Sequence, residues 1–169
     1  MTSLYEKFGY LKGLKIGIVG DISHSRVALS NIHGLKTMGA EVTLCGPATL
    51  IPPNAEELDV NVNYNLNEVI EWADALNVLR IQRERMGGGL LPSVREYRNL
   101  FGITPERLAN HKKELVIMHP GPMNRGVEID SAVADSDQAI ILDQVLNGVA
   151  SRMAILYLLL GGKYEEGKN

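Results

Sequence analysis

Residues 14–21 read Leu14-Lys15-Ile16-Gly17-Ile18-Val19-Gly20-Asp21, an apolar run that ends in a glycine and an acid. A short apolar run bounded by a turn signal is typical of a strand that is buried on both faces. Residues 24–38 then place Ala28, Ile32 and Leu35 on one side of a helix. A buried strand, a tight turn and an amphipathic helix in succession predict the first unit of a parallel α/β sheet.

The same alternation continues along the chain. Further strands are expected at 42–46, 60–64, 75–81 and 115–118, and further helices at 66–73, near 94–101, from 104 and at 141–160. Asp21 and Ser23 are expected to cap the helix that follows the first strand. Strands that alternate with helices predict a doubly wound parallel sheet with helices on both faces, a Rossmann-like three-layer αβα fold.

Composition limits the class of protein. The 169 residues carry a net charge of −3, with 45% apolar and 22% charged residues, which is typical of a soluble globular protein and leaves no basic stripe for nucleic acid. Cys45 is the only cysteine, which favours a reducing, cytoplasmic setting. The longest apolar run, 153–160, is too short to cross a membrane. The histidines lack metal-ligand spacing and there is no second cysteine, so a metal site is not expected. No other cofactor is expected either.

The loop that follows the strand at 115–118 is the first candidate site. It reads His119-Pro120-Gly121-Pro122, and such a loop offers fixed carbonyl oxygens while its prolines supply no N–H group. Ligands bind at the carboxyl ends of the strands in open α/β sheets. The alternative is an ordinary Pro-Gly turn.

Basic and amide side chains follow two other strands. Arg26 lies at the start of a helix, where a cation opposes the helix dipole, so it indicates an anionic partner or else faces solvent. Arg80 and Gln82 lie on one face of an extended segment and suit a carboxylate, because a guanidinium binds both of its oxygens. A dinucleotide site is disfavoured, because residues 17–21 lack the G-x-G-x-x-G spacing.

Four motifs occur in a fixed order: GDISHSR at 20–26, LRIQRER at 79–85, MHPGPMNRGVE at 118–128 and DQVLNGVASR at 143–152. Together they closely resemble the catalytic chain of aspartate carbamoyltransferases. The resemblance covers nearly all 169 residues, but it corresponds only to the carboxyl-terminal, aspartate-binding half of that family's chain.

The resemblance implies transfer of a carbamoyl group from carbamoyl phosphate to L-aspartate, giving N-carbamoyl-L-aspartate and phosphate in de novo pyrimidine biosynthesis. It assigns Arg26 and Arg80 to the two carboxylates of aspartate, with help from Gln82. It assigns the residues Pro120, Gly121 and Pro122 to the carbamoyl amino group of carbamoyl phosphate, through backbone carbonyls, with a cis Gly121-Pro122 peptide. No covalent intermediate is required, so orientation and stabilisation of the oxyanion would supply catalysis.

The resemblance also implies a missing partner, the amino-terminal carbamoyl-phosphate domain with its Ser-Thr-Arg-Thr-Arg phosphate loop. Residues 1–13 are then a remnant of the interdomain helix, 14–140 the aspartate-binding domain, and 141–169 a helix that would pack on the missing domain. Without that domain the chain is expected to be inactive, with the surface of 153–160 exposed or self-associating. The intact family forms homotrimers.

Two other functions stay open. The chain would also suit a non-catalytic aspartate-binding module, or one subunit of a split enzyme. An ornithine carbamoyltransferase is less favoured, because that family carries His-Cys-Leu-Pro where this chain has His119-Pro120-Gly121-Pro122.

Overall fold

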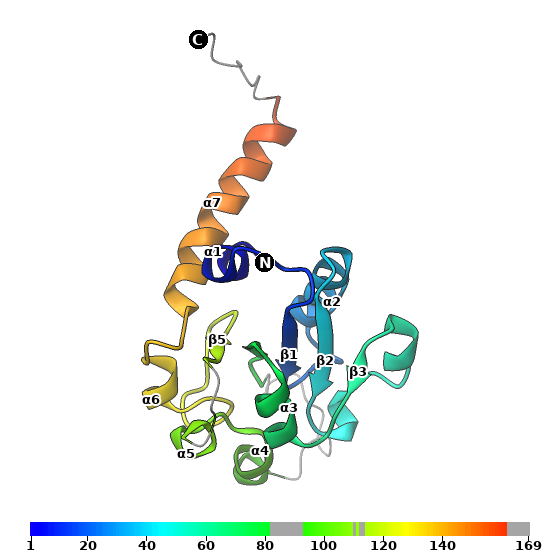
Figure 1. Ribbon diagram of the computed structural model, residues 1–169, viewed down its shortest axis with the longest axis vertical. Helices are drawn as coiled ribbons and strands as arrows, with labels where there is room; N and C mark the ends of the chain where they lie inside the picture. Colours follow the sequence, from blue (N-terminus) through cyan, green and yellow to red (C-terminus); the bar gives the residue numbers. More distant parts are fainter. Residues whose placement is uncertain (82–92, 110, 112–113, 162–169) are drawn as a thin grey trace.

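A computed structural model describes residues 1–81, 93–109, 111 and 114–161. Within them, parallel strands form one five-stranded sheet in the order β3-β2-β1-β4-β5 (Figure 1). The strands are β1 (Lys15–Val19), β2 (Glu41–Cys45), β3 (Asn61–Val62), β4 (Ala75–Val78) and β5 (Val116–Met118). Each strand predicted from the sequence is therefore confirmed. β3 is shorter than expected, because it pairs with β2 over only two residues.

The helices also follow the predicted order. They are α1 (Thr2–Phe8), α2 (Arg26–Thr37), α3 (Leu66–Trp72), α4 (Val94–Phe101), α5 (Pro105–Leu108), α6 (Ser131–Ala134) and α7 (Ile141–Leu159), with the 3-10 turns η1 (Ala48–Leu50) and η2 (Ala55–Leu58). The sequence did not predict α6, η1 or η2, because a single turn is too short to show helical periodicity.

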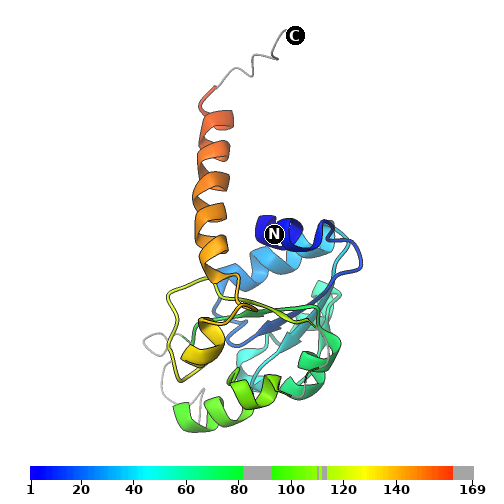
Figure 2. The same cartoon turned by 60° about the vertical axis from the view of Figure 1, so that its left-hand side comes forward.

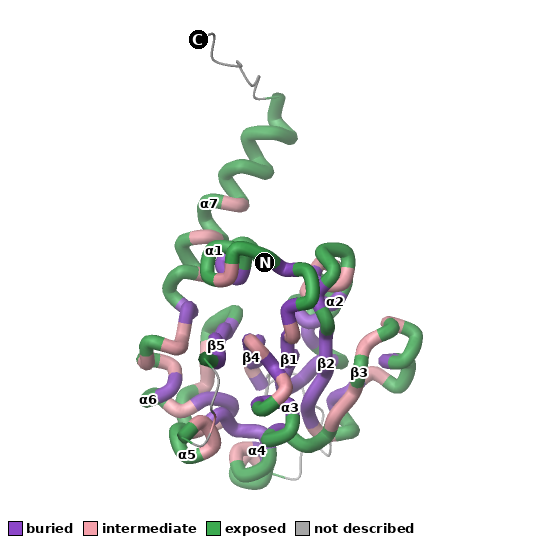
Figure 3. The backbone as a smooth tube through the Cα atoms, viewed as in Figure 1, coloured by how far each residue is buried: buried purple, intermediate pink, exposed green. Residues whose placement is uncertain are grey.

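Two hydrophobic cores lie on opposite faces of the sheet. Ile16 and Ile18 of β1 belong to the core that also contains Ile32 and Leu35 of α2. Val19, one residue further along the strand, belongs to the other core, which α3 and α4 cover. Side chains alternate across a strand, so both faces of β1 are apolar and both need a helical cover. The predicted three-layer αβα architecture is confirmed, and Figure 3 shows the buried strands at its centre.

The turn after β1 differs in detail from the sequence prediction. The side chain of Ser25, not that of Ser23, caps α2 by accepting a hydrogen bond from the Ala28 N–H at 3.1 Å. Asp21 contributes one residue earlier, because its Oδ1 accepts the His24 N–H at 3.2 Å. Ser25 immediately precedes the helix and has an extended backbone, which is the geometry of an N-cap residue.

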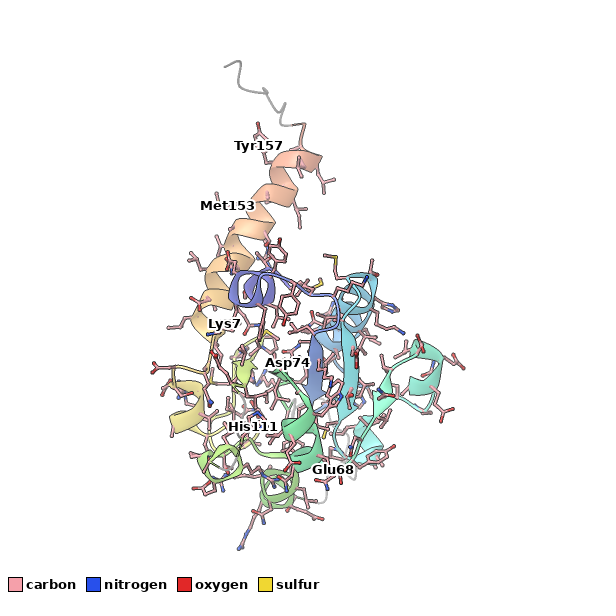
Figure 4. All side chains as sticks on the ribbon, in the orientation of Figure 1. Lys7, Glu68, Asp74, His111, Met153 and Tyr157 are labelled. Atoms are coloured by element: carbon pink, nitrogen blue, oxygen red, sulfur yellow. The ribbon has the colours of Figure 1, made fainter. Side chains whose placement is uncertain are left out.

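Helix α7 begins on the body of the protein and then leaves it. Its first half lies beside α1, where Asn147 Nδ2 donates to Ser3 Oγ at 3.0 Å (Figure 2). Its second half projects away, and Met153 and Leu160 are 65% and 82% exposed. Figure 4 shows the side chains of Met153 and Tyr157 clear of the sheet. The predicted exposure of 153–160 is confirmed. No helix in the described residues is long and apolar enough to span a membrane.

Candidate functional site

The order in which successive strands join the parallel sheet reverses between β1 and β4, which makes their carboxyl ends the natural place for a ligand. β2 and β3 lie on one side of β1, and β4 and β5 lie on the other. Loops that leave the two central strands diverge at such a point and open a crevice. β1 and β4 end at the same height in the sheet, because their last residues, Val19 and Val78, pair with each other. The Leu79 N–H also donates to the Val19 carbonyl at 2.7 Å.

Two glycines allow the loops at this point to touch. A Cβ atom on Gly46, after β2, would lie 2.5 Å from the carbonyl oxygen of Gly20, after β1. No side chain larger than hydrogen fits at Gly46 unless the backbone moves. The carboxyl ends of β1 and β2 are therefore packed backbone against backbone.

Arg26 lies at the edge that the sequence predicted. It is the first residue of α2, directly after the capping Ser25, and it is exposed. Its side chain forms no ion pair or hydrogen bond with the residues that the structure describes. A guanidinium at this helix end is available to an anion from solvent.

Arg80 follows β4 by two residues and is half-buried. The next residue, Ile81, connects this segment to the loop after β5, because its carbonyl accepts a hydrogen bond from Asn124 Nδ2 at 3.0 Å. Gln82 lies outside the described residues. Arg80 thus follows β4, which lies between β1 and β5 in the sheet. Arg26 follows β1, and the Pro-Gly-Pro loop follows β5.

The loop after β5 is exposed at Pro120, Gly121 and Pro122. The Gly121-Pro122 peptide is cis, which confirms the prediction, and Gly121 has a φ of +62°. That φ lies in the left-handed region, which a side chain would strain. The loop therefore presents backbone rather than side chains to solvent.

A buried pair of polar side chains, His119 and Glu128, holds this loop from the protein interior. Nε2 of His119 lies 3.3 Å from Oε1 of Glu128, and both side chains are 0% exposed. Nδ1 of the same ring accepts the Gly121 N–H at 2.9 Å, and Glu128 Oε1 accepts the Asn124 N–H at 2.5 Å. The sequence analysis did not assign a role to Glu128.

A second histidine–carboxylate pair lies at the end of β1. Nδ1 of His24 is 2.8 Å from Oδ1 of Asp21, and the Asp21 side chain is almost fully buried. Tyr97 of α4 is also buried nearby. Burial raises the pKa of Tyr97, and the acidic groups of Glu128, Cys45 and Asp21 act in the same direction.

The family model for the aspartate/ornithine carbamoyltransferase Asp/Orn binding domain matches residues 12–159. The chain belongs to this carbamoyltransferase family. It is 58% identical over 165 residues to the aspartate carbamoyltransferase catalytic subunit of Gemmatimonas aurantiaca, covering 98% of this chain and 52% of that protein. It is 60% identical over 162 residues to the catalytic subunit of Moorella thermoacetica, covering 96% of this chain and 53% of that protein.

A solved carbamoyltransferase shows the same architecture. The catalytic subunit of M. jannaschii aspartate transcarbamoylase superposes with a TM-score of 0.75 at 29% identity, over 93% of this chain and 53% of that one. The chain therefore spans about half the length of the relatives it matches. The resemblance stated from the four motifs is confirmed at the level of the family and the fold.

Other parts of this carbamoyltransferase domain offer less for a ligand. A cavity of about 590 Å³ lies between α3, α4 and α5, and neither Arg26, Arg80 nor the Pro120–Pro122 loop lines it. Its basic side chains are engaged within the protein: Arg98 binds Asp130, and Arg107 Nη1 donates to Asn67 Oδ1 at 2.6 Å. In the described residues, no group of three His, Cys, Asp or Glu side chains could hold a metal ion.

Proposed function

We propose that this chain is the aspartate-binding half of an aspartate carbamoyltransferase. The observation that carries the proposal is the placement of Arg26, Arg80 and the Pro120–Pro122 loop after three neighbouring strands, β1, β4 and β5. The relatives at 58% and 60% identity are named aspartate carbamoyltransferase catalytic subunits, which supports aspartate over ornithine as the acceptor.

The chemistry of the proposed site matches a dicarboxylate. One guanidinium binds both oxygens of one carboxylate, so Arg26 and Arg80 together would hold L-aspartate at both ends. Gln82 would assist Arg80 from the same segment. With its carboxylates held, the α-amine of aspartate is left to react.

The Pro120–Pro122 loop would orient the second substrate. Its backbone carbonyls accept hydrogen bonds, so they suit the amino group of carbamoyl phosphate. The amine of aspartate then attacks the carbamoyl carbon, the C–O bond to phosphate breaks, and the amine loses a proton. Orientation of the two substrates accounts for much of such a rate enhancement, and no covalent intermediate with the protein is needed.

The remaining half of the site would come from a second domain, like the part of the relatives that this chain does not match. We assign residues 14–140 to the aspartate-binding domain and residues 1–13 to the interdomain helix. Residues 141–169 would pack on the second domain, which would bind the phosphate. The exposed apolar side chains of α7 support this assignment, because a surface of that kind usually contacts another protein surface.

Complementation tests the proposal. The chain is mixed with the half of the Moorella thermoacetica subunit that it does not match, and carbamoyl-aspartate formation is measured. We expect product from the mixture and none from either half alone. Product from the chain alone would show that it holds a complete site. Binding of aspartate without product from the mixture would favour the non-catalytic aspartate-binding module.

A further inference from the structure

One N–H group decides how the Pro120-Gly121-Pro122 loop is oriented. The two prolines have no N–H, so Gly121 carries the only backbone donor of the three residues. It donates to Nδ1 of His119 at 2.9 Å, towards the protein interior. The Pro120-Gly121 peptide is trans, and in a planar trans peptide the carbonyl points opposite to the N–H. The Pro120 carbonyl is therefore directed away from His119.

The same contact fixes where the imidazole of His119 carries its proton. A backbone N–H can only donate, so Nδ1 of His119 is the acceptor and is unprotonated. In the neutral ring the proton is then on Nε2, which lies 3.3 Å from Oε1 of Glu128. Both side chains are fully buried, so water does not compete for either contact.

Glu128 also holds the far end of the loop. The same oxygen that faces His119 accepts the Asn124 N–H at 2.5 Å, so one carboxylate bridges the residues before and after the loop. Gln144 of α7 holds the start of the loop, because its Oε1 accepts the backbone N–H of His119 at 2.9 Å. The loop is thus fastened at three points by side chains that lie outside it.

We propose that His119 and Glu128 are positioning residues that hold the Pro120 carbonyl directed away from the protein interior, at the carboxyl edge of the sheet. Glu128 selects the Nε2-protonated form of His119, and that form leaves Nδ1 free to accept the Gly121 N–H. This inference rests on the proposed function, in which the carbonyls of the loop bind the carbamoyl amino group. Both side chains are fully buried, so neither would touch a substrate.

Two variants with side chains of similar size distinguish loss of the hydrogen-bond acceptor at Nδ1 from loss of the imidazole ring itself. In His119→Asn, the amide oxygen replaces Nδ1 on the same carbon and still accepts from Gly121. In His119→Gln, the amide is one carbon further out, so it reaches Glu128 but not Gly121. His33→Gln is the matched control, because His33 is exposed on α2. Glu128→Gln keeps an acceptor oxygen for the Asn124 N–H.

Kinetics in the complemented enzyme give the first readout. We expect His119→Gln to lower kcat/KM for carbamoyl phosphate by about tenfold, the scale of one lost hydrogen bond, while KM for aspartate is unchanged. His119→Asn and Glu128→Gln should stay within about threefold of the parent, and His33→Gln should equal it. Equal losses in His119→Asn and His119→Gln would overturn the proposal, because the acceptor at Nδ1 would then be irrelevant.

Nuclear magnetic resonance of the 169-residue chain gives a second readout that needs no activity. The ring ¹⁵N shifts should show a bare Nδ1 and a protonated Nε2 on His119, and the Gly121 amide should exchange about tenfold faster in His119→Gln than in His119→Asn. A proton on Nδ1 would overturn the positioning role. If the shifts and exchange are as expected but the parent mixture forms no product, the proposed function fails and the control of loop orientation stands.

Discussion

The side-chain amide of Asn124 donates a hydrogen bond to the backbone carbonyl of Ile81 at 3.0 Å. This contact joins the loop after β5 to the segment that carries Arg80. The parts of the proposed site that follow β4 and β5 are therefore linked directly by this side chain.

Asn124→Ala should loosen that connection. Removing one hydrogen bond costs about 0.5–1.5 kcal/mol, so we expect KM for aspartate in the complemented enzyme to rise about two- to tenfold. Asn54→Ala is the control, because Asn54 is exposed and binds Glu57 far along the chain from the site. An unchanged KM in Asn124→Ala would show that the two segments keep their register without this bond.

Arg26→Ala and Arg80→Ala should each weaken aspartate binding. A hydrogen bond to a charged group contributes about 1.5–3 kcal/mol, which corresponds to about a tenfold to hundredfold loss of affinity. Titration calorimetry with L-aspartate on the complemented enzyme measures the change. Arg95→Ala, which removes an exposed arginine from α4, should leave the affinity as it was. Similar losses in all three variants would point to net charge rather than to a specific site.

Tyr97→Phe should leave the protein as stable as the parent, or make it more stable. The Tyr97 hydroxyl is buried and has no hydrogen-bond partner in the part of the chain that the structure describes. Removing an unpaired buried hydroxyl relieves a desolvation cost, whereas Tyr97→Ala should cost about 3–5 kcal/mol through the cavity it leaves. Urea unfolding followed by Trp72 fluorescence measures both. A loss of more than about 1 kcal/mol in Tyr97→Phe would reveal a partner for the hydroxyl.

Alkaline pH should destabilise the fold through Cys45. Burial raises the pKa of this thiol from 9.0 to about 12, with a smaller opposing effect from Arg107. The unfolded thiol ionises first as pH rises, so the folded chain binds more protons between those values. This contribution to stability is fully present below about pH 9 and is lost as pH rises towards 12.

The slope of unfolding free energy against pH measures this effect. Between pH 9 and 11 the buried thiol contributes a fall of up to about 1.4 kcal/mol per pH unit. Cys45→Ala should flatten the slope even though it lowers stability overall. Tyr97 acts in the same direction above its ordinary pKa, so the double variant with Tyr97→Phe should be flatter still. The same slope in parent and Cys45→Ala would mean that the thiol ionises normally in the folded protein.

The apolar surface of α7 should mediate association with the second domain. Leu156→Glu places a charge on a helix whose distal side chains are exposed, and we expect it to weaken complementation by the other half at least tenfold. Arg152→Gln is the control, because it changes the net charge by the same amount without altering an apolar side chain. The two variants are compared by measuring the rate of product formation at increasing concentrations of the other half. Equal effects of the two variants would assign the association to charge.

The sequence by itself determined the strands, the main helices and the ends of strands that carry Arg26, Arg80 and Pro120–Pro122. Those features are local: apolar runs bury strands, the helical period exposes one face, and a proline after glycine marks a turn. The cis Gly121-Pro122 peptide was predictable from the same stretch once the resemblance was recognised.

Only the tertiary structure decided which side chains meet. Strand order placed β4 next to β1, and nothing local to either strand encodes that choice. The contact of His119 with Glu128 needs the loop to reverse and both side chains to lose water together, and Asn124 reaches Ile81 across 43 residues of chain. Such contacts depend on the packing of distant segments, so a pattern read along the chain cannot contain them.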